Sequence, residues 1–296
     1  MSRLKSWISA FRLRTLALSF ALIITGSAIA RTDGTFSIRI FLLALATTLF
    51  LQILSNLSND YGDAVSGVDS DRVGPQRAVQ SGAITREEMK RGMMVSAILS
   101  LVAGVALLAE SLPRIGGTGG MVMLGVGILC IIAAITYTVG KHPYGYIGLG
   151  DIGVFIFFGL VGVVGSHMMH AGAPRAEILM PATAIGLLSM GVLNMNNLRD
   201  HDGDARTGKR TLVVRFGTRW SKTYQTIIIT ASCAIWLAYI AKWGTALQFS
   251  IILPMPILIR HLKTIWTTED VEEIDKQLKT ISLTTMAMSI LFFAFA

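Results

Sequence analysis

The chain has 296 residues, of which 52% are hydrophobic and only 15% are charged, and its mean hydropathy is +0.60. Such values exclude an ordinary soluble domain. The formal net charge of +8 would suit a nucleic-acid partner, but no soluble basic region is present to bind one. The composition therefore indicates a membrane protein whose excess positive charge contacts anionic lipid headgroups.

Apolar stretches recur along the whole chain, and most approach the roughly 17 to 25 residues that a helix needs to cross a bilayer. They lie at 15–30, 38–57, 92–112, 119–139, 152–170, 178–198, 223–240, 247–262 and 281–296. We therefore expect an all-α polytopic membrane protein, with nine transmembrane helices packed as one bundle in a single domain over residues 1–296.

The distribution of basic residues predicts the orientation of this bundle. All but five of the 26 Lys and Arg residues lie before the first span or in and beside the loops that follow spans two, four, six and eight. Because Lys and Arg near helix ends stay in the cytoplasm, the N-terminus is expected inside and the C-terminus outside. The stretch that ends in "SAIA" before Arg31 imitates a secretory signal. We expect it to be kept as the first helix, and cleavage would leave the orientation unchanged.

Carboxylates are concentrated in the loop after the second span, residues 59–91. The stretch "NLSNDYGDAVSGVDSDRVG" places four of them within twelve positions, namely Asp60, Asp63, Asp69 and Asp71. Asn59 and Asp63 are four residues apart. If the helix continues past the membrane boundary, these two side chains will therefore lie on one face of it.

A second loop, residues 199–222, repeats this pattern. The stretch "NMNNLRDHDGD" places Asn196, Asp200 and Asp204 at successive steps of four residues. Like charges at this spacing destabilise a helix, and carboxylates beside hydrocarbon cost still more, so cations must offset them. One interpretation is ordinary ion pairing with the nearby bases Arg72, Arg77, Arg199, Arg206, Lys209 and Arg210.

The repeated combination of asparagine and aspartate favours a second interpretation. Mg²⁺ prefers oxygen ligands and is usually held by a few carboxylates, by waters and by the oxygens of a substrate phosphate. Bases among the acids, especially "GKR" at 208–210, would contact a diphosphate that the metal bridges. The two clusters together predict a metal–diphosphate site. A third acidic loop, "TTEDVEEIDKQLK", lacks asparagines and is expected to be a solvated connector.

The two clusters resemble the UbiA superfamily of intramembrane prenyltransferases. The resemblance rests on "NxxxDxxxGxD" (59–69), "DRVGPQRAVQSG" (71–82) and "NNLRDHDGDARTGKRTL" (196–212), and it extends to "FRLRTL" and "YTVGKHPYGYIGLGD". It is closest to the menaquinone-pathway branch. It implies nine helices with both Asp loops on the cytoplasmic side. It also implies Mg²⁺-dependent transfer of a polyprenyl group from its diphosphate to 1,4-dihydroxy-2-naphthoate, with loss of CO₂, to give demethylmenaquinol.

The resemblance also implies a role for each matching residue. The metal ions would be held by Asn59, Asp60, Asp63, Asp69, Asn196, Asp200 and Asp204, of which Asp63, Asp69, Asp200 and Asp204 would act in catalysis. The diphosphate would be bound by Arg72, Arg77, Lys209 and Arg210. The superfamily usually has a third Asp four residues after Asp63, where this chain has Gly67 and then Asp69. The third ligand of the first cluster is therefore open.

Two residues flank the loop between the fourth and fifth spans. Tyr137 and Asp151 are expected to orient the aromatic acceptor or to take its phenolic proton. An interfacial aromatic anchor explains Tyr137 equally well, and capping of a helix would by itself place Asp151. Positive-inside anchoring likewise accounts for Arg12 and Arg14 without a contact to substrate.

Several other motifs are expected to carry no chemistry. "GLGDIG" (148–153) has the spacing of a dinucleotide-binding loop but lacks the preceding strand, so no nucleotide cofactor is expected. His167 and His170 have no third metal ligand near them in the sequence. Cys130 and Cys233 lie in separate apolar spans and are expected to pack as small residues.

Two other functions are open. The first is a prenyltransferase of the same superfamily that acts on 4-hydroxybenzoate, homogentisate or a tetrapyrrole. The second is a secondary transporter, because transporters also have repeats and carboxylates within the membrane. Transporter acids normally lie near the bilayer midplane, whereas these clusters lie at helix ends. We therefore expect an enzyme of the bacterial inner membrane that binds a polyprenyl diphosphate and a bicyclic aromatic acid.

Overall fold

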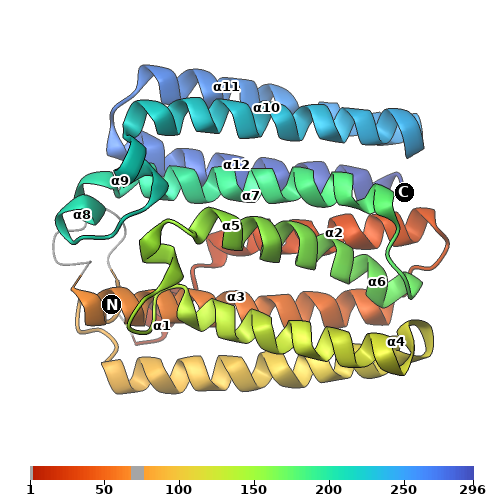
Figure 1. Cartoon of the computed structure of the whole chain (residues 1–296), viewed down its shortest axis with the longest axis horizontal. Coiled ribbons are helices and arrows are strands. Elements are labelled where there is room, and N and C mark those ends of the chain that lie inside the picture. The colour runs from red at the N-terminus through yellow and green to blue at the C-terminus, as the bar shows by residue number, and fades with distance from the viewer. Residues whose placement is uncertain (1–2, 68–76) are drawn as a thin grey trace.

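The computed structural model describes residues 3–67 and 77–296, without the side chain of Arg14, and its regular elements within these ranges are all helical. The long helices lie side by side and alternate in direction (Figure 1). The elements are α1 (Arg3–Phe11), η1 (Leu13–Thr15), α2 (Leu16–Thr32), α3 (Ile38–Ser66), α4 (Arg86–Thr136), η2 (Tyr144–Ile147), α5 (Gly150–Val154), η3 (Phe155–Val164), α6 (Gly165–Ala171), η4 (Ala176–Ile178), α7 (Leu179–Arg199), α8 (His201–Arg206), α9 (Leu212–Phe216), α10 (Thr218–Trp243), η5 (Leu247–Ile252), α11 (Met255–Thr267) and α12 (Val271–Ala294).

Local signals set the ends of α3, the helix that carries the first acidic cluster. At its start, the Ser37 side chain accepts a hydrogen bond from the backbone N–H of Ile40. At its end, Gly67 adopts a φ of 76°, a left-handed conformation that glycine reaches without a steric penalty. The helix therefore continues nine residues beyond the predicted span 38–57, and Asn59 and Asp63 lie on its last turns.

The longest helix, α4, reverses direction within its length. It has 51 residues, so it would be about 75 Å long if straight, more than twice the roughly 30 Å thickness of the hydrocarbon core. Gly116, three residues after Pro113, has non-helical dihedral angles (φ 68°, ψ 173°). Figure 1 shows the two halves running antiparallel. We call them the first arm (86–115) and the second arm (117–136).

The predicted count of nine spans is not confirmed by helix length and composition. Among the described residues, six helices are long and apolar enough to cross a membrane, or seven if α1 and α2, bent by 46°, form one span. The difference has two causes. Helix α4 contains the predicted span 92–112 and most of the predicted span 119–139, and the predicted span 247–262 is divided between η5 and the 13-residue α11.

Residues 150–171 form one continuous helical segment, in which α5 and α6 are α-helical and the middle part, η3, is π-helical. π-helical turns are rare in proteins and often lie at functional sites. This segment packs closely on α7, because a Cβ atom on Gly159 would lie only 2.7 Å from the Ala182 carbonyl oxygen. η3 therefore forms a fixed wall beside the helix that carries the second acidic cluster.

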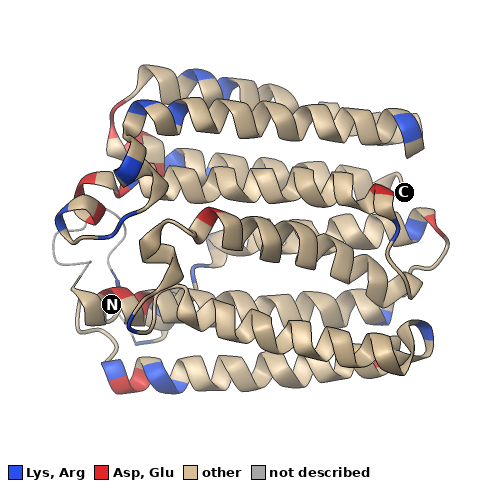
Figure 2. Ribbon diagram, in the orientation of Figure 1, with Lys and Arg blue, Asp and Glu red and all other residues tan. Residues whose placement is uncertain are grey.

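The apolar core lies on the opposite side of the bundle from the arms of α4. Fully buried side chains of α2, α7, α10 and α12 meet there, including Ile29, Leu188, Trp236 and Met288. By contrast, only 6% of the most apolar window of α4 is buried, as expected for a surface that faces lipid. Figure 2 shows charged residues gathered at the two ends of the bundle, with an uncharged band between them.

Candidate active site

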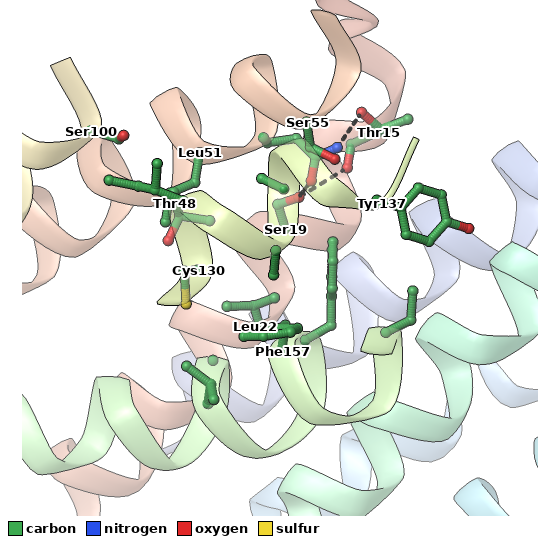
Figure 3. Close-up of a pocket in the computed structure, with 18 of the residues that line it drawn as sticks. Thr15, Ser19, Leu22, Thr48, Leu51, Ser55, Ser100, Cys130, Tyr137 and Phe157 are labelled. Atoms are coloured by element: carbon green, nitrogen blue, oxygen red, sulfur yellow. Dashed lines mark hydrogen bonds between the residues drawn. The ribbon is translucent and has the colours of Figure 1, made fainter. Parts of the chain in front are cut away.

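A cavity of about 410 Å³ lies between α2, α3, the two arms of α4, η3 and α7. This volume is within the range of roughly 300 to 1,000 Å³ that is usual for ligand-binding pockets. Apolar side chains such as Leu22, Leu51 and Phe157 line most of it (Figure 3), while charged and amide groups from the ends of α3 and α7 also contribute to its wall. The cavity therefore suits a ligand that has a charged head and a hydrocarbon body.

The last turns of α3 bring the first acidic cluster to this cavity. Asn59 and Asp63, one helical turn apart, both line it. Gly62 lets the chain after α4 approach closely, because a Cβ atom there would lie 2.5 Å from the Thr138 carbonyl oxygen. The Thr138 hydroxyl lies 2.9 Å from the Ser58 carbonyl oxygen and 3.1 Å from Asn59 Oδ1. This hydrogen bonding fixes the Asn59 side chain at the cavity wall.

Two side chains distant in sequence bind the Asp63 carboxylate. Arg77 Nη2 donates to one oxygen and the Tyr146 hydroxyl donates to the other. Arg77 also lines the cavity, although only 6% of it is exposed. Burial, and then the negative charge of Asp63, raise the pKa of the Tyr146 phenol, so the phenol stays protonated and can donate. The ion-pair interpretation thus holds for Asp63 and Arg77, and sequence reasoning did not identify Tyr146.

The end of α7 brings the second cluster to the same cavity, where Asn196 and Asp200 line the wall. Arg199 binds both of them. Its Nη2 lies 2.8 Å from Asn196 Oδ1, and its Nε lies 2.7 Å from Asp200 Oδ1. Its Nη1 reaches Asp275 of α12 at 2.5 Å. The structure therefore places parts of both clusters at one cavity, and here too a basic residue pairs with the acid.

Asp204 and Lys209 form a third buried pair, beyond the end of α7. Lys209 Nζ lies 3.3 Å from Asp204 Oδ1, and Lys209, 9% exposed, lines the cavity. Asp204 is 3% exposed, and its Oδ2 has no hydrogen-bond partner among the described residues. Burial raises the pKa of the Asp204 carboxyl to about 6, and the Lys209 charge opposes this rise. A buried carboxylate with an unused oxygen is suited to bind a cation.

The amide and carboxylate oxygens of Asn59, Asp63, Asn196, Asp200 and Asp204 are of the kind that binds Mg²⁺. In residues 3–67 and 77–296, no group of three or more His, Cys, Asp and Glu side chains lies close enough to hold a metal. Mg²⁺ needs fewer protein ligands, because it keeps waters and takes oxygens from a bound phosphate. Two predicted residues, Asp69 and Arg72, lie outside the described residues.

The structure gives Asp60 a different set of contacts from its neighbour Asp63. Its two carboxylate oxygens accept hydrogen bonds from the backbone N–H groups of Ala78 and Val79, at 3.0 and 3.2 Å. Asp60 is buried and is not among the residues that line the cavity. These contacts attach the chain at residues 78–79 to α3.

Replacement of Asp60 by alanine is therefore expected to destabilise the protein by about 2 to 3 kcal/mol, because two buried N–H groups lose a charged acceptor. Thermal unfolding in detergent would measure this loss. The concentration of Mg²⁺ needed for half-maximal activity should stay the same. A protein of unchanged stability that needs much more Mg²⁺ would instead identify Asp60 as a metal ligand.

Of the three other predicted residues, only Tyr137 lines the cavity, and Figure 3 shows it there. Asp151 accepts a hydrogen bond from the Tyr224 hydroxyl of α10 at 3.0 Å, and it is not among the lining residues. Arg210 is exposed, and its backbone N–H donates to the Tyr146 carbonyl oxygen at 2.7 Å. Direct contacts of Asp151 with an acceptor and of Arg210 with phosphate stay predictions.

Sequence reasoning did not identify a group of uncharged polar residues that also line the cavity, namely Thr15, Ser19, Thr48, Gln52 and Ser55. A signal was present for those on α3. Thr48, Gln52, Ser55 and Asn59 stand four, three and four residues apart, the spacing of one helix face, inside an otherwise apolar stretch.

Known proteins of the family that the sequence motifs resemble match this chain along almost its whole length. The model of the UbiA prenyltransferase family matches residues 18–291. A protein of Escherichia coli (strain K12), named 1,4-dihydroxy-2-naphthoate octaprenyltransferase, is 43% identical over 276 residues, which are 91% of this chain and 88% of that protein. A protein of the same name from Haemophilus influenzae is 39% identical over 295 residues, with 98% and 95% covered.

Solved structures share the fold. A UbiA homolog from Aeropyrum pernix K1 has a TM-score of 0.69 at 16% identity and covers 96% of each chain. A UbiA homolog from Archaeoglobus fulgidus bound to GPP and Mg²⁺ has a TM-score of 0.64 at 15% identity, with 99% and 100% covered. The apolar helices define an integral membrane protein, and the cavity with charged residues in its wall is suited to an amphipathic ligand. The chain belongs to the UbiA prenyltransferase family.

Proposed function

We propose that the protein transfers a polyprenyl group from a polyprenyl diphosphate to 1,4-dihydroxy-2-naphthoate, with loss of CO₂, to form demethylmenaquinol. The observation that carries this proposal is one cavity that combines Asn59, Asp63, Asn196 and Asp200 with a long apolar wall. The names of the relatives that are 38 to 43% identical support the acceptor and an octaprenyl donor.

Magnesium would be held by Asn59, Asp63, Asn196 and Asp200, with Asp204 and Asp69 as further ligands. We leave out Asp60, because both its oxygens already accept backbone N–H groups. The bound ion would supply positive charge to the diphosphate as the allylic C–O bond breaks. The A. fulgidus homolog, which was solved with GPP and Mg²⁺, supports this assignment.

The buried bases would bind the rest of the diphosphate. Arg77 and Lys209 line the cavity and are both nearly inaccessible to bulk solvent, so their charges are poorly screened. Their contacts to phosphate oxygens would strengthen as negative charge collects on the leaving group, and stabilisation of this kind is often the largest contribution to catalysis. Arg72 and Arg210 are proposed to assist from the adjoining loops.

The chemical step is balanced without any further reactant. The allylic C–O bond breaks and its electron pair leaves with the diphosphate, while an electron pair of the naphthoate ring forms the new C–C bond. The bond from the ring to the carboxylate then breaks and returns its electrons to the ring as CO₂ departs. Tyr137, which lines the cavity, would orient the acceptor, and the apolar helices would keep water away from the reactive allylic carbon.

We further propose that the protein lies in the bacterial inner membrane with this site on the cytoplasmic side. The excess of Lys and Arg in the loops on that side supports the orientation. The donor's hydrocarbon chain would then lie along the cavity between the arms of α4, where exposed apolar side chains such as Leu101 and Leu124 belong both to the cavity wall and to the outer surface.

Purified protein in proteoliposomes tests the function directly. With Mg²⁺, octaprenyl diphosphate and dihydroxynaphthoate, and without any ion gradient, we expect prenylated naphthalenediol and released CO₂. If 4-hydroxybenzoate or homogentisate is prenylated and the naphthoate is not, the proposed acceptor is wrong and the prenylated compound takes its place. Uptake of a solute without any prenylated product would show a transporter and refute the proposal.

Filling the apolar part of the cavity should affect long donors more than short ones. Gly127 of the second arm lines the cavity, and a Cβ atom there would meet nothing within 4 Å, so the backbone has room for a side chain and Gly127→Phe would take up space at the cavity. We expect kcat/KM for octaprenyl diphosphate to fall about tenfold or more, with little change for geranyl diphosphate. Gly125→Phe is the matched control, because Gly125 has the same free space but does not line the cavity. Equal losses for both donors would contradict the proposed position of the tail.

A further inference from the structure

A row of polar side chains continues from the acidic cluster into the membrane along one face of α3. Thr48, Gln52, Ser55 and Asn59 all line the cavity, although α3 is long and apolar enough to span a bilayer. A polar group in a span is costly unless it has a partner, and such groups usually serve a function. The polar row therefore needs an explanation beyond the packing of α3.

Gln52 is at the centre of a small hydrogen-bonded group. Its Nε2 donates to Thr15 Oγ1 and to Asn56 Oδ1, both at 3.2 Å. The Ser19 hydroxyl donates to Gln52 Oε1 at 2.5 Å. This group joins η1 and α2 to α3, and its members Thr15 and Ser19 also face the cavity, as Figure 3 shows. The amide of Gln52 is thus held in one orientation at the cavity wall.

Ser55 and Thr48 add free hydroxyl groups to this wall. In an apolar helix, Ser and Thr hydroxyls normally bond to the backbone carbonyl one turn earlier, as Thr47 does to Leu43 at 2.8 Å. In the part of the chain that the structure describes, the hydroxyls of Ser55 and Thr48 make no hydrogen bond. Both can therefore donate to a ligand in the cavity and accept from it.

The chemistry of this wall fits the aromatic acceptor and not the donor's tail. A prenyl chain has no hydrogen-bonding group, so polar side chains gain nothing from contact with it. An aromatic acid with phenolic hydroxyls can both donate to and accept from uncharged amide and hydroxyl groups. An uncharged site also avoids competing for the diphosphate, which the charged residues Arg77 and Lys209 would attract.

The position of Gln52 along α3, deeper in the membrane than the acidic cluster, also suits the aromatic acceptor. Gln52 precedes Asn59 by seven residues, which corresponds to about 10 Å along a helix. A diphosphate bound beside Asn59 and Asp63 would point its allylic carbon into the membrane. The acceptor carbon must approach that allylic carbon to about 3 to 3.5 Å, so the ring, a few ångströms across, would reach the level of Gln52 and Ser55.

We propose that Gln52 and Ser55, with Thr15 and Ser19 holding Gln52 in place, bind the phenolic hydroxyls of the aromatic acceptor and set which ring carbon faces the donor. This inference rests on the proposed function and deepens it. Gln52 and Ser55 are the binding residues, and Thr15 and Ser19 act through Gln52 as positioning residues.

The test compares wild type with Gln52→Leu and Ser55→Ala in proteoliposomes. Loss of one neutral hydrogen bond should raise KM for dihydroxynaphthoate about tenfold in Gln52→Leu and about threefold in Ser55→Ala, while KM for octaprenyl diphosphate stays within about twofold. Ser55→Ala removes only a hydroxyl that has no protein partner, so it should fold even if Gln52→Leu does not. Calorimetric titration of dihydroxynaphthoate gives the same comparison without turnover.

Two analogues, 1-hydroxy-2-naphthoate and 4-hydroxy-2-naphthoate, identify the contact. As inhibitors, the analogue that lacks the recognised hydroxyl should bind wild type and Gln52→Leu equally, and the other should lose about tenfold in the variant. The matched control is Gln248→Leu, because Gln248 is buried at the start of η5 and does not line the cavity.

The possible outcomes separate the two proposals. If wild type neither binds nor converts dihydroxynaphthoate, the proposed acceptor is wrong, and the acceptor site assigned for it is wrong as well. If wild type converts it while both variants keep the wild-type KM and binding constant, the function stands and the Gln52 site is refuted. Equal increases in both KM values, or the same change in Gln248→Leu, would show a general structural effect and would also refute the site.

Discussion

Asp63→Asn and Asp200→Asn are each expected to lower kcat for prenyl transfer by at least about 100-fold. The reason is electrostatic: each change removes a full negative charge from the group that would hold magnesium against the diphosphate, and loss of one element of such a preorganised site typically costs roughly 10² to 10³ in kcat. Both residues line the cavity and come from different helices, so each change should be severe on its own. Mass spectrometry of the product formed in proteoliposomes measures the effect.

Asparagine is a better substitute than alanine at these positions. Asp63 binds the buried Arg77, and removing one partner of a buried ion pair can cost about 3 to 5 kcal/mol, a large fraction of the roughly 5 to 15 kcal/mol by which ordinary proteins are stable. Asparagine keeps the shape and one acceptor oxygen for Arg77 or Tyr146. Thermal unfolding and elution as a single species should therefore show that both variants are folded, which separates a loss of chemistry from a loss of structure.

The control is Glu87→Gln. This change also removes a carboxylate, but from an exposed ion pair with Lys90 in the first turn of α4. It should leave turnover within about twofold, because exposed ion pairs contribute little. Near-normal turnover in both Asp63→Asn and Asp200→Asn would overturn the metal assignment.

The sequence predicted the class of fold because hydropathy is a local property. Each apolar stretch became helical, and the charge pattern left the middle of the bundle uncharged. The count of spans was less secure. The turn in α4 depends on one residue, Gly116, and "PRIGG" marks it in the sequence without fixing how the two arms are counted. The π-helical turns of η3 were not predicted, and one of their glycines, Gly159, packs closely against α7.

The acidic site was predictable to the extent that its residues share a helix. Four-residue spacing placed Asn59 with Asp63 and Asn196 with Asp200. The first pair lies within α3, whereas α7 ends at Arg199 and Asp200 is the residue that follows its last turn. The spacing could not separate Asp63 from Asp60, because the backbone groups that bind Asp60 lie at residues 78 and 79. The phenol of Tyr146 and the guanidinium of Arg77 reach Asp63 from distant parts of the chain, which periodicity does not describe.

The surroundings of Asp151 could not be predicted from the sequence either. An acid at a helix start beside the membrane suggested catalysis, yet the structure gives it a neutral partner, the Tyr224 hydroxyl of α10. Whether a carboxylate faces a cavity or a neighbouring helix depends on the tertiary fold. Arg12, for which positive-inside anchoring was a sufficient explanation, and Gln52, which was left unremarked, both line the cavity.

Enzyme treated with EDTA to remove magnesium should lose prenyl transfer by roughly 1,000-fold or more. Added Mg²⁺ should restore the activity, because without the ion the leaving diphosphate would lack its counter-charge. Ca²⁺ should restore much less activity, since it prefers six to eight oxygen ligands at longer distances and this site offers few. Normal turnover in the presence of EDTA would refute a role for the metal.

The ion pairs of the site predict how metal and donor bind together. Each of the ion pairs contributes at least one residue to the cavity wall: Asp63 pairs with Arg77, Asp200 with Arg199, which is not among the lining residues, and Lys209 with Asp204, which is not among them either. Mg²⁺ alone would compete with these bases for the carboxylates, and diphosphate alone would compete with the acids for the bases. When Mg²⁺ and diphosphate are both present, each carboxylate can exchange its base for the metal ion, and each base can exchange its carboxylate for a phosphate oxygen. Binding of the two should therefore be strongly cooperative.

Thermal shift measurements test this exchange of partners. Mg²⁺ alone and a non-reactive diphosphate analogue alone should each raise the unfolding temperature by about a degree or less, whereas both together should raise it by several degrees, as expected for ligands that bind only the folded state. The cooperative part should disappear in Asp200→Asn and persist in Glu87→Gln. Additive shifts in wild type would show that metal and diphosphate bind independently, and they would contradict a site in which both clusters hold one metal–diphosphate group.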